Sequence, residues 1–410
     1  MDNQLLRDLT KHYHNITPED VVGVTITKKT VGGKMTDEDA VVFTVKQKRP
    51  LEEIPEDELL PSEIEVDGSI LKTDVEEGEF VFMENCPSDF YTWINTPPAN
   101  RNQIRPLQGG ISVTNYTNLG SYVGTLGFLA VDTETNSLVG VSNNHVLVKN
   151  AFLASERQQS GVHTDIVNNF VTQPNESGNS GLQNSIGLVK RYVPISGTPE
   201  YNSVDGALAT VNQSDISSTT SYRQYGMNGW TQPLEFASTA EIDSLVTNGI
   251  NLFSAGRTTG PKGEGDMKLF ASSVAATISI QYNNQGVNET IYFSDCIRYY
   301  ASASTTPAGS ICPYPVYGGD SGSALVADFS GTRKIVGLVF AGANYNGQTI
   351  YGLANRIDKV AEQLSISAWT GNSVYFSDTG TTELHIVNGL SGDINLELSG
   401  NTYWQGGTRT

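Results

Sequence analysis

The chain contains little cysteine. Only Cys86, Cys296 and Cys312 occur in 410 residues. An odd and sparse set is unusual for a disulfide-stabilised secreted protein, and the three residues show no metal-ligand spacing. We therefore expect reduced thiols, no metal or cofactor, and a cytoplasmic protein. A disulfide between Cys296 and Cys312 stays open, because it depends on whether the fold brings them together.

The chain also lacks an excess of basic charge and long apolar runs. Its formal net charge is −19, and residues 52–79 are notably acidic. Such a surface repels phosphates, which argues against nucleic acids and anionic membranes as partners. No stretch reaches the roughly 18 apolar residues of a spanning helix, and the amino terminus has neither the basic start nor the apolar core of a signal peptide. The sequence leaves open whether the chain forms homo-oligomers.

Long helical patterns are scarce, whereas short runs of Val, Ile, Thr and Tyr alternate with turn residues and 41 glycines. This texture predicts a mainly β fold. Two batches of about six short strands suggest a pair of β-barrels followed by one amphipathic helix. The predicted organisation is a small α/β domain at 1–85, a linker at 86–108, barrels at about 109–211 and 251–353, a closing helix at 354–366, and a β-rich appendage at 367–410.

The stretch YGGDSGSAL, residues 317–325, holds the candidate nucleophile, Ser321. A serine hydroxyl reacts at neutral pH only when a neutral imidazole accepts its proton. Of the five histidines, His145 alone stands at the end of a β-like run within the first predicted barrel, in GVSNNHVLV. A strand end is a rigid place from which to aim a ring, so we expect His145 to be the base.

A carboxylate is needed to hold the imidazole tautomer. Asp205 opens the apolar run DGALATV, where a carboxylate requires a partner. Asp132 and Asp165 are rivals, although neither leads directly into a buried run. The flanking glycines suit an oxyanion site, because Gly319 can adopt backbone geometry closed to other residues. We expect the N–H groups of Gly319 and Ser321 to be its donors.

These motifs resemble the trypsin/chymotrypsin-type serine peptidases. GGDSGSALV is similar to their nucleophile motif and SNNHVL to their histidine motif, and KIVGLVFAG resembles the strand that lines the specificity pocket and binds substrate backbone. The resemblance covers about residues 109–366 and implies a double β-barrel with its catalytic groups in the order His, Asp, Ser. SNNHVL, NSVDGALA, GRTTG and GLVFAG resemble most closely a branch of bacterial trypsin-like proteins and the plant narrow-leaf proteins. The extension GVTITKK…VGGK…DEDAVVFTVK is similar to that branch as well.

Two departures from the family matter. The histidine follows Asn-Asn where secreted relatives have Ala-Ala, and the adjacent disulfide is missing, as suits a reducing compartment. In secreted relatives a new terminal amine pairs with the aspartate before the serine, whereas Asp320 has no such partner in the sequence. We expect either that an internal group orders the oxyanion loop or that the site is latent.

The same resemblance bounds specificity. By motif register, Pro315 stands at the pocket floor, and Val339, Phe340, Ala341 and Gly342 line the pocket. No carboxylate lies between Cys312 and Gly319 or from Leu338 to Asn355. A basic side chain is therefore disfavoured, and we expect a small or apolar one.

The leading hypothesis is an endopeptidase that acts on a specific protein or peptide through an acyl-enzyme. One alternative is a regulatory or scaffolding protein that binds peptides in a latent peptidase cleft. Another is self-processing that releases residues 367–410 or the amino-terminal domain.

Overall fold

The structure of the protein is a computed structural model. The structure describes residues 3–18, 20–31, 34–66, 68–82, 99–116, 123–148, 170–174, 184–197, 199–227, 230–264, 268–284, 287–302, 315–345 and 348–371. Among them, strands far outnumber helices and gather in two sheets of fourteen and eight strands. The prediction of a mainly β protein is therefore confirmed.

The eight-stranded sheet is built mainly from the first half of the chain. Its strand order is β22-β8-β9-β13-β11-β10-β6-β7. Gly127 alone separates β7, the last strand of this order, from β8, and side chains of these strands form an apolar cluster. The elements are β6 (Ile111–Asn115), β7 (Gly124–Leu126), β8 (Phe128–Asp132), β9 (Ser137–Ser142), α3 (Asn144–Leu147), β10 (Phe170–Thr172), β11 (Ser185–Tyr192), β13 (Ala207–Thr210) and β22 (Ile366–Ala368).

The larger sheet contains a closed ring of six strands, because β17 pairs with β18 as well as with β15. The ring runs β15-β17-β18-β21-β20-β19 and back to β15. The elements of this half are β12 (Tyr201–Asn202), β14 (Glu235–Phe236), α5 (Thr239–Asp243), β15 (Asn251–Gly256), β16 (Gly260–Lys262), β17 (Leu269–Asn284), β18 (Val287–Ala301), β19 (Ala324–Phe329), β20 (Thr332–Tyr345), β21 (Gln348–Arg356) and α6 (Ile357–Leu364). Short 3₁₀ turns cover Ala99–Arg101 and Gln213–Asp215.

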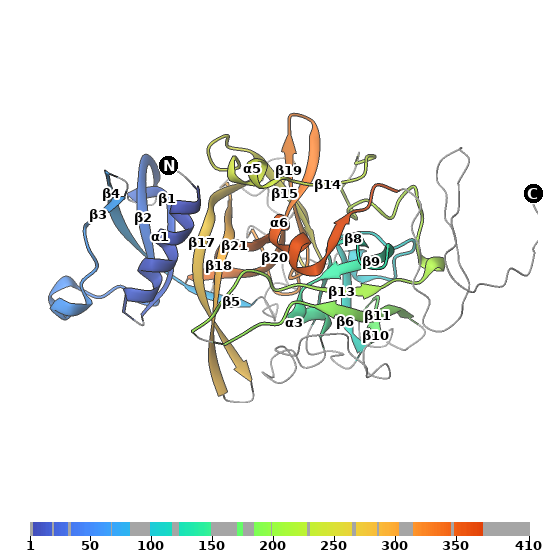
Figure 1. Cartoon of the computed structure of the whole chain (residues 1–410), viewed down its shortest axis with the longest axis horizontal. Coiled ribbons are helices and arrows are strands. Elements are labelled where there is room, and N and C mark those ends of the chain that lie inside the picture. Colours follow the sequence, from blue (N-terminus) through green and yellow to red (C-terminus); the bar gives the residue numbers. More distant parts are fainter. Residues whose placement is uncertain are drawn as a thin grey trace, which may run out of the picture.

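The amino-terminal segment joins this same sheet, because β1 pairs with β17 and β5 pairs with β20. Figure 1 shows the segment in blue at one end of the molecule, with the light-blue β5 reaching toward the middle. Its division from the rest as a separate domain stays a prediction. The elements are α1 (Asn3–Ile16), β1 (Val21–Val31), β2 (Lys34–Val45), 3₁₀ turns at Leu51–Glu53 and Glu56–Glu58, β3 (Glu63–Val66), β4 (Ser69–Glu77) and β5 (Glu79–Phe82).

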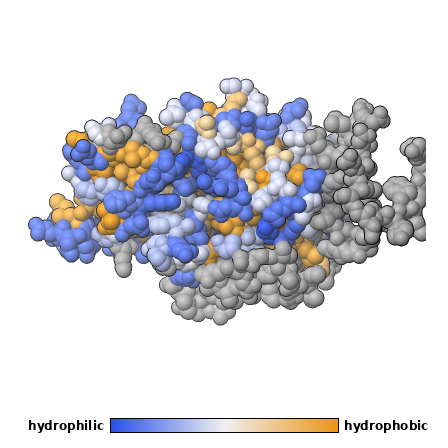
Figure 2. Space-filling model, viewed as in Figure 1, coloured by the Kyte–Doolittle hydropathy of each residue, from blue (hydrophilic) through white to orange (hydrophobic). Residues whose placement is uncertain are grey.

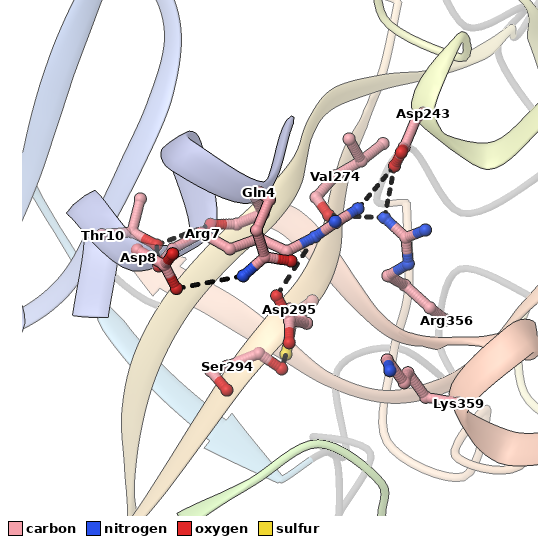
Figure 3. A network of polar contacts seen from close by, with 12 residues as sticks. Gln4, Arg7, Asp8, Thr10, Asp243, Val274, Ser294, Asp295, Arg356 and Lys359 are labelled. Atoms are coloured by element: carbon pink, nitrogen blue, oxygen red, sulfur yellow. Dashed lines mark hydrogen bonds and ion pairs between the residues drawn. The ribbon is translucent and has the colours of Figure 1, made fainter. Parts of the chain in front are cut away.

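Ion pairs attach α1 to the larger sheet. Arg7 donates to Asp243 at 2.6 Å and lies 3.3 Å from Asp295. Asp243 also accepts from Arg356, whose side chain is only 1% exposed and which pairs with a second carboxylate, that of Asp358. Figure 3 shows the Arg7 and Arg356 guanidinium groups side by side below the Asp243 carboxylate, where both contact the same oxygen. Because Arg356 is buried, its charge depends on these two carboxylates.

Apolar packing joins the parts. One cluster combines side chains from both sheets, including Val139, Leu208, Leu252 and Leu338. The described surface in Figure 2 mixes hydrophilic areas with apolar ones, some of them over the amino-terminal segment at the left. The large apolar side chains left exposed in the described ranges all belong to that segment: Ile16, Leu51, Leu59 and Ile70.

The predicted linker and the predicted carboxy-terminal appendage both contribute buried residues. Within the predicted linker, Asn100 is 3% exposed, and its Nδ2 donates to the carbonyls of Gly110 and Gly256, one from each half of the molecule. The first residues of the predicted appendage form β22, which pairs with β8, and Trp369 is buried. Residues 372–410 lie outside the described ranges.

Candidate active site

His145 and Asp205 meet in the smaller sheet. His145 lies in α3, which follows directly on β9, and Asp205 lies just before β13, the neighbour of β9. The imidazole Nδ1 is 2.5 Å from Asp205 Oδ2, and the His145 backbone N–H donates to Oδ1 at 3.2 Å. Both residues are buried, with the Asp205 side chain fully inaccessible. A buried carboxylate that accepts at Nδ1 favours the tautomer whose basic nitrogen is Nε2.

Two asparagines hold the Asp205 backbone. Asn143 Nδ2 donates to the Asp205 carbonyl at 2.6 Å, and the Asp205 N–H donates to Asn355 Oδ1 at 2.9 Å. Asn355 comes from β21, so the larger sheet helps to place a carboxylate of the smaller one. Asn143 stands within the SNNHVL motif, whereas no local signal in the sequence points to Asn355.

Ser321 lies in the turn before β19, where the two sheets touch. Its carbonyl accepts from the Thr125 N–H of β7 at 2.8 Å. A Cβ added at Gly124 would lie 2.4 Å from Val146 and 2.8 Å from the Ser321 carbonyl oxygen. Only the backbone of Gly124 fits between Val146, the residue after His145, and the Ser321 carbonyl. The Ser321 hydroxyl is buried and donates to the Phe340 carbonyl at 3.3 Å.

The peptide between Gly318 and Gly319 has a fixed orientation. Its carbonyl accepts from Thr258 Oγ1 at 2.5 Å. Because the C=O and N–H of a trans peptide point in opposite directions, the Gly319 N–H points away from Thr258. Gly319 has a φ of +93°, and a Cβ there would lie 2.5 Å from the Thr258 hydroxyl. Only glycine suits this position.

The next peptide N–H that matters belongs to Ser321. The carbonyl of the same peptide, that of Asp320, accepts from the Ser323 N–H at 2.9 Å. The Ser321 N–H is directed oppositely. The directions of the Gly319 and Ser321 N–H groups are thus determined by hydrogen bonds to the carbonyls of the same two peptides, one from the Thr258 hydroxyl and one from the Ser323 N–H.

Asp320 is the residue that orders this turn. Its buried carboxylate accepts from the N–H groups of Thr258 and Thr259 at 2.9 and 3.0 Å, and from that of Tyr317 at 2.9 Å. Burial raises the pKa of Asp320, although Lys262 and the hydrogen bonds act in the opposite direction. Backbone N–H groups within the chain are therefore the hydrogen-bond partners of the Asp320 carboxylate, for which no terminal amine is evident in the sequence.

Asp132 and His14, the alternative acid and a second histidine within the described ranges, have partners of their own. Burial alone would raise the pKa of Asp132, but hydrogen bonds from Lys190 and Arg191 outweigh it and lower the pKa to about 2. His14 is buried in α1 against Tyr201, 2.8 Å from its hydroxyl. Asp165 and the remaining histidines of the loop and the appendage, His163 and His385, lie outside the described ranges.

The predicted pocket residues are all buried, but they are buried by different contacts. Pro315 is buried at the start of the described turn. The Phe340 ring packs against Phe293 at a centroid distance of 4.8 Å, so its carbonyl, and not its ring, faces Ser321. Ala341 and Gly342 pair on both sides, with β21 and with β5. No local pattern in the sequence predicts this contact with β5.

Other kinds of site find little support in the described ranges. They contain no cluster of His, Cys, Asp or Glu that could hold a metal ion. No helix in them is both long and apolar enough to span a membrane. Cys296 is buried and free, and burial raises the pKa of its thiol. Cys86 and Cys312 are not among the described residues.

Comparisons with solved structures find a limited backbone similarity to bacterial proteases. No protein-family model and no curated protein matches the chain. Among solved structures, the Nocardiopsis protease is 17% identical with a TM-score of 0.37, protease A of Thermobifida fusca 14% with 0.35, and the chymotrypsin of Cellulomonas bogoriensis 13% with 0.36. Each match covers 64% of this chain and 98 to 99% of the other.

Proposed function

We propose that this protein is a serine endopeptidase with a trypsin-like double β-barrel, and that Ser321, His145 and Asp205 are its catalytic residues. The observation that carries the proposal is the buried pair of His145 and Asp205, with Nδ1 2.5 Å from Oδ2. The pair lies in the smaller sheet, whose strand β7 forms a hydrogen bond with the Ser321 backbone. A buried acid on Nδ1 leaves Nε2 as the basic nitrogen of the ring, which is what a serine nucleophile requires.

In the proposed reaction, the Ser321 hydroxyl rotates away from the Phe340 carbonyl and attacks the carbonyl carbon of the substrate. His145 takes the hydroxyl proton, and Asp205 stabilises the imidazolium that results. The N–H groups of Gly319 and Ser321 stabilise the negative charge on the substrate oxygen. The proton then passes to the leaving amine, and water attacks the acyl-enzyme by the reverse sequence to release the second product.

The proposed substrate is a protein or peptide that carries a small or apolar side chain in the pocket. The absence of a carboxylate from residues 312–319 and 338–355 supports this preference. A cytoplasmic location remains part of the proposal and follows from the sparse cysteines.

A fluorophosphonate probe tests the assignment, because it reacts only with an activated serine. We expect Ser321→Ala and His145→Ala to abolish labelling, and Asp205→Asn to slow it by 10²- to 10⁴-fold because the ring loses its tautomer control. Ser323→Ala is the matched control, since Ser323 is an equally buried serine two residues away. Labelling of the Ser321→Ala protein at the wild-type rate would show that the nucleophile is another residue.

A further inference from the structure

One edge of β20 leads directly to the candidate nucleophile. β21 runs along the opposite edge from Gly337 onward. The edge in question pairs with β19 as far as Leu338. At the next residue, Val339, it exchanges hydrogen bonds with the Gly322 N–H and the Ser323 carbonyl, at 2.8 and 2.9 Å.

A β-bulge then brings the Phe340 carbonyl to the same edge. Val339 and Ala341 pair with adjacent residues of β21, so Phe340 is the extra residue. Bulges of this kind redirect backbone and side-chain groups. The redirected carbonyl accepts from the Ser321 hydroxyl.

The next positions of this edge are occupied by β5. Ala341 pairs with Phe82, Gly342 with Val81 and Ala343 with Phe80, in antiparallel register. Ser321 and β5 therefore take up consecutive positions along a single edge, and β5 runs toward the serine. The light-blue β5 can be followed in Figure 1 from the amino-terminal segment to the β20 region.

Side chains hold β5 firmly in this place. Phe80 is 2% exposed and belongs to the same apolar cluster as Phe340. Glu76, just before β5, accepts from Arg298 at 2.5 Å and from the Tyr351 hydroxyl at 3.2 Å. Because the Arg298 side chain is only 2% exposed, its pairing with Glu76 is a specific buried contact and not a surface encounter.

An extended peptide binds an open sheet edge through backbone hydrogen bonds. Each N–H and C=O of the β20 edge can serve only one such strand, so β5 and an incoming peptide exclude each other. We propose that the edge from Ala341 to Ala343 is the peptide-binding edge of the site and that β5 is its intramolecular occupant. Substrate must displace β5 to reach Ser321. This inference rests on the proposed peptidase function.

The sequence of β5 also indicates the chemistry of the ligand. β5 places Phe80 and Val81 opposite two small residues, Ala343 and Gly342. Small residues on an edge strand leave room for large neighbours. We infer that the displacing peptide is extended and carries bulky apolar side chains at these positions.

Two variants of the full chain test the proposal. Val81→Pro removes a backbone donor in the middle of β5 and disfavours strand pairing. Phe80→Ala keeps the backbone but empties the buried site of the ring, and it preserves the test if the proline variant does not fold. Ile70→Pro is the control, because Ile70 is exposed and pairs with Glu65, away from β20. We expect fluorophosphonate labelling of Ser321 to be at least tenfold faster in both β5 variants than in the wild type and the control.

A binding measurement separates this inference from the proposed function. A fluorescent peptide of residues 76–82 should bind the Ser321→Ala/Val81→Pro protein, and should bind Ser321→Ala alone at least tenfold more weakly. Equal labelling rates and equal peptide affinities with and without an intact β5 would overturn the inference while leaving the peptidase assignment in place. If peptide binding follows β5 but no variant is labelled, the edge assignment holds and the proposed function fails.

Discussion

Thr258 offers a sharp test of how the proposed oxyanion donors are oriented. Its hydroxyl donates to the Gly318 carbonyl and so fixes the direction of the Gly319 N–H. Thr258→Val keeps the shape of the side chain and removes only that hydroxyl. The backbone N–H of Thr258, which donates to Asp320, is retained.

The expected size of the effect follows from two terms. Leaving a buried carbonyl without its donor costs about 1 to 3 kcal/mol, which the peptide can relieve by turning over. The two glycines offer little steric resistance to that rotation. Once turned, the Gly319 N–H no longer faces the proposed position of the oxyanion, and losing one such donor costs about 3 kcal/mol of transition-state stabilisation, or about 10²-fold in kcat.

Hydrolysis of a p-nitrophenyl ester measures kcat and KM separately. We expect kcat to fall by about 10²-fold with little change in KM, because the oxyanion contact forms in the transition state. Thr332→Val, at an exposed strand start, is the matched control. A kcat within twofold of wild type, together with a lowered free energy of unfolding, would refute the reasoning, since the hydroxyl would then stabilise the fold without orienting the peptide.

Two further predictions concern stability. Glu76→Gln leaves the buried Arg298 with a neutral partner. We expect the free energy of unfolding in urea to fall by about 1 to 3 kcal/mol, which is less than for a fully buried pair because Glu76 is 21% exposed. A loss below about 0.5 kcal/mol would mean that the contacts of Arg298 with Ser272 and the Tyr351 ring are sufficient to stabilise its charge. Burial lowers the pKa of His14 to about 4, so its contribution is fully present above the unfolded value of 6.5 and is lost as the pH falls toward 4. We therefore expect wild type to lose about 2 to 3 kcal/mol more than His14→Gln between pH 7.5 and 4.5, and parallel pH profiles of the two proteins would contradict this.

The sequence was most informative where local pattern and chemistry coincide. Asp205 precedes an apolar strand, and an acid in that setting needs a partner. The contact with His145 Nδ1 supplies one. The mainly β fold likewise follows from short alternating runs. A local pattern of this kind survives folding because it is satisfied within neighbouring strands.

Contacts between distant segments were not predictable in the same way. The run that becomes β5 alternates like any strand, and alternation fixes which face is buried but not which strand is the neighbour. Its pairing with β20 joins residues more than 250 positions apart. Asn355 of β21 holds the Asp205 backbone of the other sheet through one hydrogen bond, and nothing in its own surroundings in the sequence marks it. Thr258 lies in the GRTTG motif, but the motif does not reveal its hydrogen bond to Gly318, 60 residues further along the chain.

The position of β5 also constrains how the chain is completed during synthesis. The partner edge in β20 leaves the ribosome roughly 260 residues after β5, about 10 to 50 s later at ordinary elongation rates. Until then the Phe80 side chain and the β5 backbone have no permanent site. A nascent chain of this length is therefore exposed to chaperones and to premature pairing with other strands, and synonymous changes that slow elongation before residue 332 should lower the yield of folded protein.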